Sequence, residues 1–239
     1  MGVTMTTLGS SSKGNSYVIE CKEDTLIIEL GINFKDILST IKYDIGKVRG
    51  CLVSHLHKDH SKYIKDAIYY GLPVYSCKET SEANEGVITM QLGKKTMIGN
   101  FSVQPIPVVH SCECYAFLIE HPEMGRTLFV TDCVSFGYKV KDIDHLMIEA
   151  NYDDESIIEN AMNDSFSRSQ SQNHMSFDNT LKAIRNNYNP RMKDIVLLHA
   201  SMYNSNTVKY EKDVKEEFGL CNVYVAEKGL KICFDKDEF

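Results

Sequence analysis

The feature that most constrains this chain is the six-residue run from His55 to His60, HLHKDH, in which four residues carry side chains that commonly bind metals. The run follows the apolar segment Val48 to Ser54, so it lies at the end of a predicted strand. A loop that leaves a strand can turn several neighbouring imidazole and carboxylate groups toward one zinc, manganese or iron ion. A chance surface cluster is the alternative. The two interpretations differ in whether other strand ends supply further ligands.

Three more potential ligands occur at similar positions in the sequence. His110, Asp132 and His199 each follow directly on a short run of apolar or β-branched residues. Four strand ends that all carry metal-binding side chains are hard to reconcile with a chance surface cluster. The pattern therefore favours a metal centre built from distant parts of the chain.

The pattern of apolar residues predicts a layered α/β fold. Short β-rich runs dominate the first half and suggest a sheet built largely from hairpins. Later apolar runs alternate with helix-like segments at Asp154 to Met162 and Phe177 to Asn187, and Lys209 to Glu217 is typical of a solvated helix. The polar segment Asn163 to Asn173 is predicted to be a loop. The predicted strands are Val3 to Leu8, Tyr17 to Glu20, Thr25 to Leu30, Val48 to Ser54, Leu72 to Ser76, Phe101 to Val109, Tyr115 to Glu120, Thr127 to Val130, His145 to Ile148 and Ile195 to Leu198.

Size and composition limit the class of protein. The 239 residues, 43% of them hydrophobic, are enough for one sizeable core, and we expect a single domain over residues 1–239. No apolar run approaches the roughly 20 residues that span a bilayer, and nothing resembles a signal peptide, so we expect no membrane partner and a cytoplasmic location. The eight scattered cysteines are interpreted as reduced, mostly buried thiols. A net charge of -7 argues against a broad surface for long nucleic acid.

The motif H-x-H-x-D-H, present here as His55, His57, Asp59 and His60, resembles that of the metallo-β-lactamase superfamily, and the resemblance extends over nearly the whole chain. It implies the α/β metallo-β-lactamase αββα sandwich and a cofactor of two divalent metal ions, zinc or manganese. The implied assignment is that His55, His57 and His110 hold one ion, that Asp59, His60 and His199 hold the other, and that Asp132 bridges them. Two such ions can generate hydroxide at neutral pH, with Asp59 as its partner. Because four positive charges meet only two ligand carboxylates, an anionic substrate is favoured.

Further residues resemble the tRNase Z side of the superfamily and its small exonuclease-like relatives. Glu149 ends an apolar run followed by Ala150, and His174 is followed by Ser176, as in motifs of that branch. The resemblance implies a proton-transfer pair in which Glu149 orients His174, and His174 stabilises or protonates the leaving oxygen. The structural alternative is that Glu149 caps a strand and that His174 is an exposed loop residue.

One loop and two single residues are further candidates for contact with the substrate or support of the metal site. The loop Gly9 to Ser16 resembles a Gly/Ser loop of the exonuclease-like members, which presents hydroxyl and amide groups to phosphate or to the metal site; a plain hairpin turn is the alternative. Arg168 is a candidate phosphate contact. Glu29 stands where relatives commonly have Asp, which leaves its supporting role open.

The leading functional prediction is a dinuclear metal-dependent phosphodiesterase with nuclease-like action on nucleic acid ends or short single strands. The stretch between Asp132 and His199 is too short for the added domain of long-RNA and DNA processing members, and the chain lacks a basic tRNA-clamping arm. The alternative is a cyclic nucleotide phosphodiesterase of the kind with which phages destroy defence signals, its pocket completed by a homodimer partner or by the loop Asn163 to Asn173. A thioester hydrolase and an iron-dependent oxygenase of the same fold are further alternatives.

Overall fold

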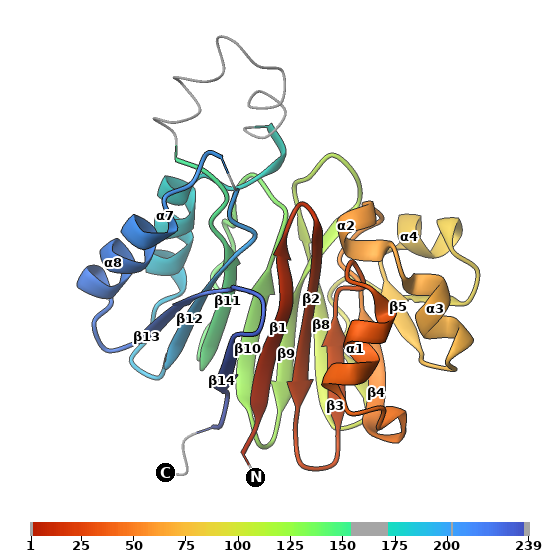
Figure 1. Cartoon of the computed structure of the whole chain (residues 1–239). Coiled ribbons are helices and arrows are strands. Elements are labelled where there is room, and N and C mark those ends of the chain that lie inside the picture. The colour runs from red at the N-terminus through yellow and green to blue at the C-terminus, as the bar shows by residue number, and fades with distance from the viewer. Residues whose placement is uncertain (1, 154–171, 202, 237–239) are drawn as a thin grey trace.

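The computed structural model describes residues 2–153, 172–201 and 203–236. Within these residues two seven-stranded sheets face each other, and helices cover the outer face of each sheet (Figure 1). The layers follow the order helix, sheet, sheet, helix. The α/β sandwich predicted from the sequence is therefore confirmed.

The first sheet combines the N-terminal part of the chain with one strand from near the C-terminus. Strands β1 to β3 pair antiparallel, as hairpins do, but β3 to β6 pair parallel. The prediction of a sheet built largely from hairpins is wrong for β3 to β6, because parallel neighbours need crossover connections, which here run through short helices. In spatial order the strands are β14 (Lys231–Cys233), β1 (Thr4–Ser11), β2 (Gly14–Glu20), β3 (Thr25–Ile28), β4 (Val48–Leu52), β5 (Val74–Ser76) and β6 (Val87–Thr89).

The second sheet brings several strand ends to one edge. Strand β9 is antiparallel to both β8 and β10, and β10 to β13 are mutually parallel. Strands β8, β10, β11 and β12 therefore run in the same direction, and their carboxyl ends lie along the same edge. In spatial order the strands are β13 (Asn222–Val225), β12 (Asp194–Leu198), β11 (His145–Glu149), β10 (Gly125–Val130), β9 (Cys114–His121), β8 (Phe101–Val108) and β7 (Thr96–Ile98).

Helices α1 to α4 lie on the first sheet, and α7 and α8 lie on the second (Figure 1). Helix α7 begins and ends where the sequence predicted, and its N-cap Ser176 accepts a hydrogen bond from the backbone N of Asn179. No helix in the described ranges is long and apolar enough to cross a membrane. The helices are α1 (Phe34–Thr40), the 3-10 turn η1 (Ile45–Lys47), α2 (Lys58–Ser61), α3 (Ile64–Tyr69), α4 (Lys78–Ala83), α7 (Phe177–Asn187) and α8 (Thr207–Glu217).

The main apolar cluster fills the space between the two sheets. Tyr17 from β2 meets Phe129 from β10 at 5.5 Å between ring centroids, and Phe117 from β9 lies 6.4 Å from Phe129. A second apolar cluster lies between the first sheet and its helices, and a third lies between the second sheet and its helices. Central strands such as β12 are buried along their whole length, which explains their continuous rather than alternating apolar pattern. This packing fixes the strand ends of both sheets relative to each other.

A close backbone approach holds α2 against the loop that follows β3. Leu30 N donates to the His60 carbonyl at 2.7 Å, and Tyr63 N donates to the Leu30 carbonyl at 2.9 Å. Gly31 lies so near that a Cβ there would stand 1.7 Å from the Asp59 carbonyl oxygen. Only glycine fits this position. Because Gly31 has no side chain, the backbone of the HLHKDH segment can pack directly against it.

Candidate active site

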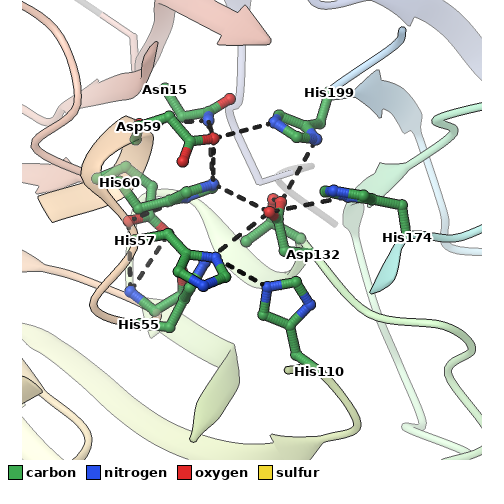
Figure 2. Close-up of polar contacts among 12 residues, drawn as sticks. Asn15, His55, His57, Asp59, His60, His110, Asp132, His174 and His199 are labelled. Atoms are coloured by element: carbon green, nitrogen blue, oxygen red, sulfur yellow. Dashed lines mark hydrogen bonds and ion pairs between the residues drawn. The ribbon is translucent and has the colours of Figure 1, made fainter. Parts of the chain in front are cut away.

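All seven side chains predicted as metal ligands gather at one end of the sandwich, where strands of both sheets finish (Figure 2). They come from four separate places in the sequence, as the strand-end pattern predicted. His55 and His57 follow β4, Asp59 and His60 lie on α2, His110 follows β8, Asp132 follows β10 and His199 follows β12.

The first cluster consists of His55, His57 and His110. His57 Nδ1 lies 3.1 Å from His110 Nε2. The outer nitrogens are held: His110 Nδ1 donates to the Asn173 carbonyl at 2.8 Å, and His55 Nδ1 lies 2.8 Å from Ser54 Oγ. His55 Nε2 is buried and has no hydrogen-bond partner among the described residues. An inner ring nitrogen whose outer neighbour is fixed by a hydrogen bond is the usual arrangement of a metal-binding histidine.

The second cluster consists of Asp59, His60, Asp132 and His199. His60 Nε2 lies 3.1 Å from Asp59 Oδ2 and 3.2 Å from Asp132 Oδ2. His199 Nε2 lies 3.4 Å from Asp59 Oδ2, and His199 Nδ1 lies 3.5 Å from Asp132 Oδ1. Potential ligand atoms of all four residues lie within 4.8 Å of one another, which is compatible with one divalent ion.

Asp132 lies between the two clusters. Its Oδ2 is 3.2 Å from His60 Nε2 and 3.9 Å from His55 Nε2, so one carboxylate oxygen faces a histidine of each cluster. This is the position that the resemblance to metallo-β-lactamases assigns to a bridging ligand. Two features fit divalent cations in this site: the buried His55 Nε2 has no hydrogen-bond partner among the described residues, and several carboxylate oxygens gather close together.

Strained backbone accompanies the site. Asp132, His199 and Glu29 adopt positive φ angles of 27°, 51° and 66°. Such conformations cost about 1–3 kcal/mol each in residues other than glycine and persist where the surrounding structure holds them. Here the strain turns the side chains that follow β10 and β12 into the common site.

Three residues support the ligands from behind. The buried Glu29 accepts a hydrogen bond from Ser54 N and places Oε2 3.4 Å from Nδ1 of His60, a predicted metal ligand, despite the departure from the expected Asp. Asn15 Nδ2 donates to Asp59 Oδ2 at 3.2 Å, and Asn151 Nδ2 donates to the His199 carbonyl at 2.7 Å. Sequence analysis missed both asparagines, although Asn15 lies in the Gly/Ser loop and Asn151 lies two residues after Glu149.

The carboxylates of the site remain ionised. Burial raises the pKa of Asp59, but hydrogen bonds from His199 and His60 outweigh burial and hold that pKa well below its usual range. Burial likewise opposes ionisation of Asp132, and the charges of His199 and His60 keep its pKa well below normal. Conversely, burial lowers the pKa of His199, but Asp132 and the hydrogen bond to Asp59 raise it to about 10. The ionised carboxylates of Asp59 and Asp132 thus need positive charge nearby to be stable, and protonated histidines or divalent cations can supply it.

Glu149 and His174 form the pair predicted from the sequence. Glu149 Oε1 lies 2.7 Å from His174 Nδ1, and Oε2 accepts from the backbone N of Cys133 at 3.0 Å and of Met175 at 3.1 Å. The His174 ring stacks on His199 with 5.2 Å between centroids, and 21% of its side chain is exposed. His174 is thus held beside Glu149 rather than exposed in a loop, and the proton-transfer role of the pair stays a prediction.

The Gly9 to Ser16 segment is both a hairpin turn and a wall of the site. It joins β1 to β2, and Ser10 Oγ accepts a hydrogen bond from His199 N at 2.8 Å. The hairpin interpretation is therefore confirmed, and a contact between this loop and phosphate or metal stays a prediction. Arg168, the helix-like segment Asp154 to Met162, and all but the last two residues of the loop Asn163 to Asn173 lie outside the described residues.

Comparison with known sequences finds two exodeoxyribonucleases among similar proteins. Exodeoxyribonuclease YycJ of Bacillus anthracis is 28% identical over 174 residues, which cover 66% of this chain and 66% of that protein. Exodeoxyribonuclease WalJ of Streptococcus pneumoniae is 25% identical over 174 residues, with 64% of each chain covered. The chain thus spans slightly less than two thirds of the length of the curated relatives it matches. No family model matches it.

Comparison with solved structures identifies the fold. The metallo-β-lactamase fold protein YhfI from Bacillus subtilis superposes with a TM-score of 0.75 at 17% identity, over 97% of this chain and 99% of that one. A diphosphatase from the PhnP family gives 0.73 at 15% identity, covering 100% and 99%, and human tRNase Z, short form, gives 0.62 at 13%, covering 97% and 99%. The predicted metallo-β-lactamase fold is therefore confirmed.

Proposed function

We propose that this chain, which has the metallo-β-lactamase fold, is a dinuclear metal-dependent phosphodiesterase with nuclease-like action on nucleic acid ends or short single strands. The observation that carries the proposal is the 2.7 Å contact between Glu149 and His174. The pair lies beside a cluster of three histidines and a cluster of histidines and carboxylates, and Asp132 faces both clusters. Clusters of this kind bind metals in hydrolases of several substrate classes. The additional pair of Glu149 and His174 suits a substrate whose leaving oxygen needs a proton.

The proposed metal ligands are those predicted from the sequence. His55, His57 and His110 would hold one ion, Asp59, His60 and His199 the other, with Asp132 shared between them. Zinc and manganese both accept imidazole and carboxylate ligands. When bound, two divalent ions would supply an activated water and neutralise negative charge on the phosphoryl oxygens.

The protein groups have separate tasks in this proposal. Asp59, whose pKa is held well below normal, stays ionised and accepts a hydrogen bond from the attacking water, while Asn15 fixes its orientation. Glu149 holds the Nδ1 proton of His174, which leaves Nε2 for the leaving oxygen. Burial lowers the pKa of His174, but the charge of Glu149 and its hydrogen bond raise it above normal overall, which favours the protonated form that a general acid needs.

Three observations support a nucleic acid substrate. Two relatives of similar sequence are named exodeoxyribonucleases, and two proteins of similar fold are named a diphosphatase and a tRNase Z. Divalent ions in the site would attract a short anionic end, whereas the acidic chain of net charge -7 disfavours binding along a duplex.

The test compares substrate classes on one preparation. Metal-stripped protein is given zinc or manganese and assayed in parallel with bis-p-nitrophenyl phosphate, single-stranded oligonucleotides, 3′,5′-cyclic nucleotides and a thioester. Shortening of the oligonucleotides is the expected result. Turnover of cyclic nucleotides alone would replace the nuclease proposal by its alternative, and reaction of the thioester alone would refute the phosphodiesterase assignment.

The role of His174 has its own test. His174→Ala should slow cleavage of oligonucleotides, whose leaving alkoxide needs a proton, by roughly 10²–10⁴-fold. Bis-p-nitrophenyl phosphate, with its good leaving group, should be affected much less, and this substrate is the internal control. The metal content should remain close to that of the parent protein. Loss of metal, or an equal loss of activity on both substrates, would contradict a role in leaving-group protonation.

A further inference from the structure

The side chain of Cys112 lies beside the first cluster, and the proposed mechanism gives Cys112 no role. It lies in the loop between β8 and β9, two residues after His110, and is half-buried. Its Sγ is 3.9 Å from His57 Nε2. One potential ligand atom from each of His55, His57, His110 and Cys112 can be chosen so that all four lie within 4.8 Å of one another.

A further potential donor lies close to the histidine cluster. His55 is fully buried, and its Nε2, which faces the cluster, has no hydrogen-bond partner among the described residues. The three histidines and the shared Asp132 would give the first ion four protein ligands, and Cys112 would add a sulfur, which is a common ligand of zinc. The buried His55 nitrogen without a hydrogen-bond partner among the described residues and the Cys112 sulfur close to the three histidines are separate observations that fit a cation at this cluster.

We propose that Cys112 is an additional side-chain ligand of the ion held by His55, His57 and His110. This inference rests on the metal centre proposed above and adds a thiolate to it. As the sulfur–metal bond forms, the thiol gives its proton to solvent, so no oxidant or other reactant is required.

The other cysteines near the site are engaged differently. Cys114 is buried behind His55, where its Sγ lies 3.6 Å from the outer nitrogen Nδ1 and 3.7 Å from the Asp132 carbonyl. Cys77 lies 3.3 Å from the Glu113 carbonyl and 3.1 Å from Thr80 Oγ1, contacts that hold the neighbouring loop. Of these three sulfurs, only that of Cys112 groups with the ligand nitrogens of the cluster.

A thiolate would change which metal the first cluster prefers. Soft sulfur ligands favour zinc, whereas manganese prefers oxygen ligands. The first cluster would therefore select zinc, and the second cluster, with its carboxylates, would accept either metal. Cys112→Ser should weaken zinc binding at one of the two sites by roughly tenfold or more and leave manganese binding nearly unchanged.

The decisive experiment is the absorption spectrum of the cobalt(II)-loaded protein. The parent chain and Cys233→Ser, which alters an exposed cysteine, should both show a near-ultraviolet sulfur-to-cobalt charge-transfer band. Cys112→Ser should bind the same amount of cobalt without this band. A band that persists in Cys112→Ser, or is absent from a cobalt-loaded parent chain, overturns the proposal for Cys112 and leaves the proposed function standing. Failure of the parent chain to bind cobalt at all would remove both.

Chemical labelling gives a second measurement that needs no variant. Alkylation of the native protein, followed by mass spectrometry of its peptides, should modify Cys112 in the metal-stripped protein and spare it after zinc is added. The exposed Cys233 should be modified in both samples and serves as the control. Equal labelling of Cys112 with and without bound zinc would contradict its role as a ligand.

Discussion

At the scale of single residues, the site depends on contacts between neighbouring side chains, and the Asp59 carboxylate makes three of them. Its Oδ2 lies within 3.4 Å of His60, His199 and Asn15. Asp59→Ala should lower bound metal by about one ion per chain and reduce turnover by more than roughly 100-fold, since even the loss of an outer-shell partner costs 10–100-fold. Metal analysis and oligonucleotide cleavage measure the two effects. Retained activity would refute the two-metal assignment.

Glu29 offers a subtler residue-scale test. Its carboxylate faces His60 Nδ1, and an amide in its place would turn either a weaker acceptor or a second donor toward that nitrogen. Glu29→Gln should therefore weaken metal binding at the second cluster by roughly 10–100-fold. Glu23→Gln, at an exposed position near the start of the same strand, is the matched control. Similar metal titration curves for the two variants would show that Glu29 does not orient His60.

At the scale of elements, the position of α2 depends on its contact with the loop after β3. A Cβ at Gly31 would overlap the Asp59 carbonyl, so Gly31→Ala should displace α2 and destabilise the fold by roughly 1–3 kcal/mol. Gly137→Ala is the control, because a Cβ there meets no atom within 4 Å. Denaturant unfolding with and without metal measures the difference. If both variants unfold at the same denaturant concentration, α2 does not rely on this close approach.

The sequence predicted most long elements and all of the principal site residues, for a physical reason. Strands such as β12 are buried on both faces and therefore form continuous apolar runs, and four metal-binding side chains rarely gather by chance in six residues, as they do in HLHKDH. The edge strands β6, β7, β13 and β14 were missed because they have only three or four residues and are partly exposed. Asn15, Asn151 and Cys112 were missed as site residues because their side chains gain a role only from neighbours brought near by folding.

At the scale of the whole molecule, metal binding and folding should be coupled, because both sheets contribute to the site. At a free metal concentration about 100 times its Kd, each ion adds about 2.7 kcal/mol. For a chain of this size that corresponds to roughly 5–11 °C in Tm. Scanning calorimetry before and after chelation, with zinc restored as the control, measures the shift. An unchanged Tm, with metal loss verified, would contradict a site shared by the two sheets.

The order of the proposed ligands along the chain has a consequence for synthesis on the ribosome. The side chains of the first cluster are complete once His110 and Cys112 have emerged, but the second cluster needs Asp132 and finally His199. A nascent chain could thus capture an ion at the first cluster well before the second exists. The second ion would have to arrive after β12 has joined its sheet. Loading would then be sequential in time, with the thiolate-containing position filled first and the chain inactive until His199 has emerged.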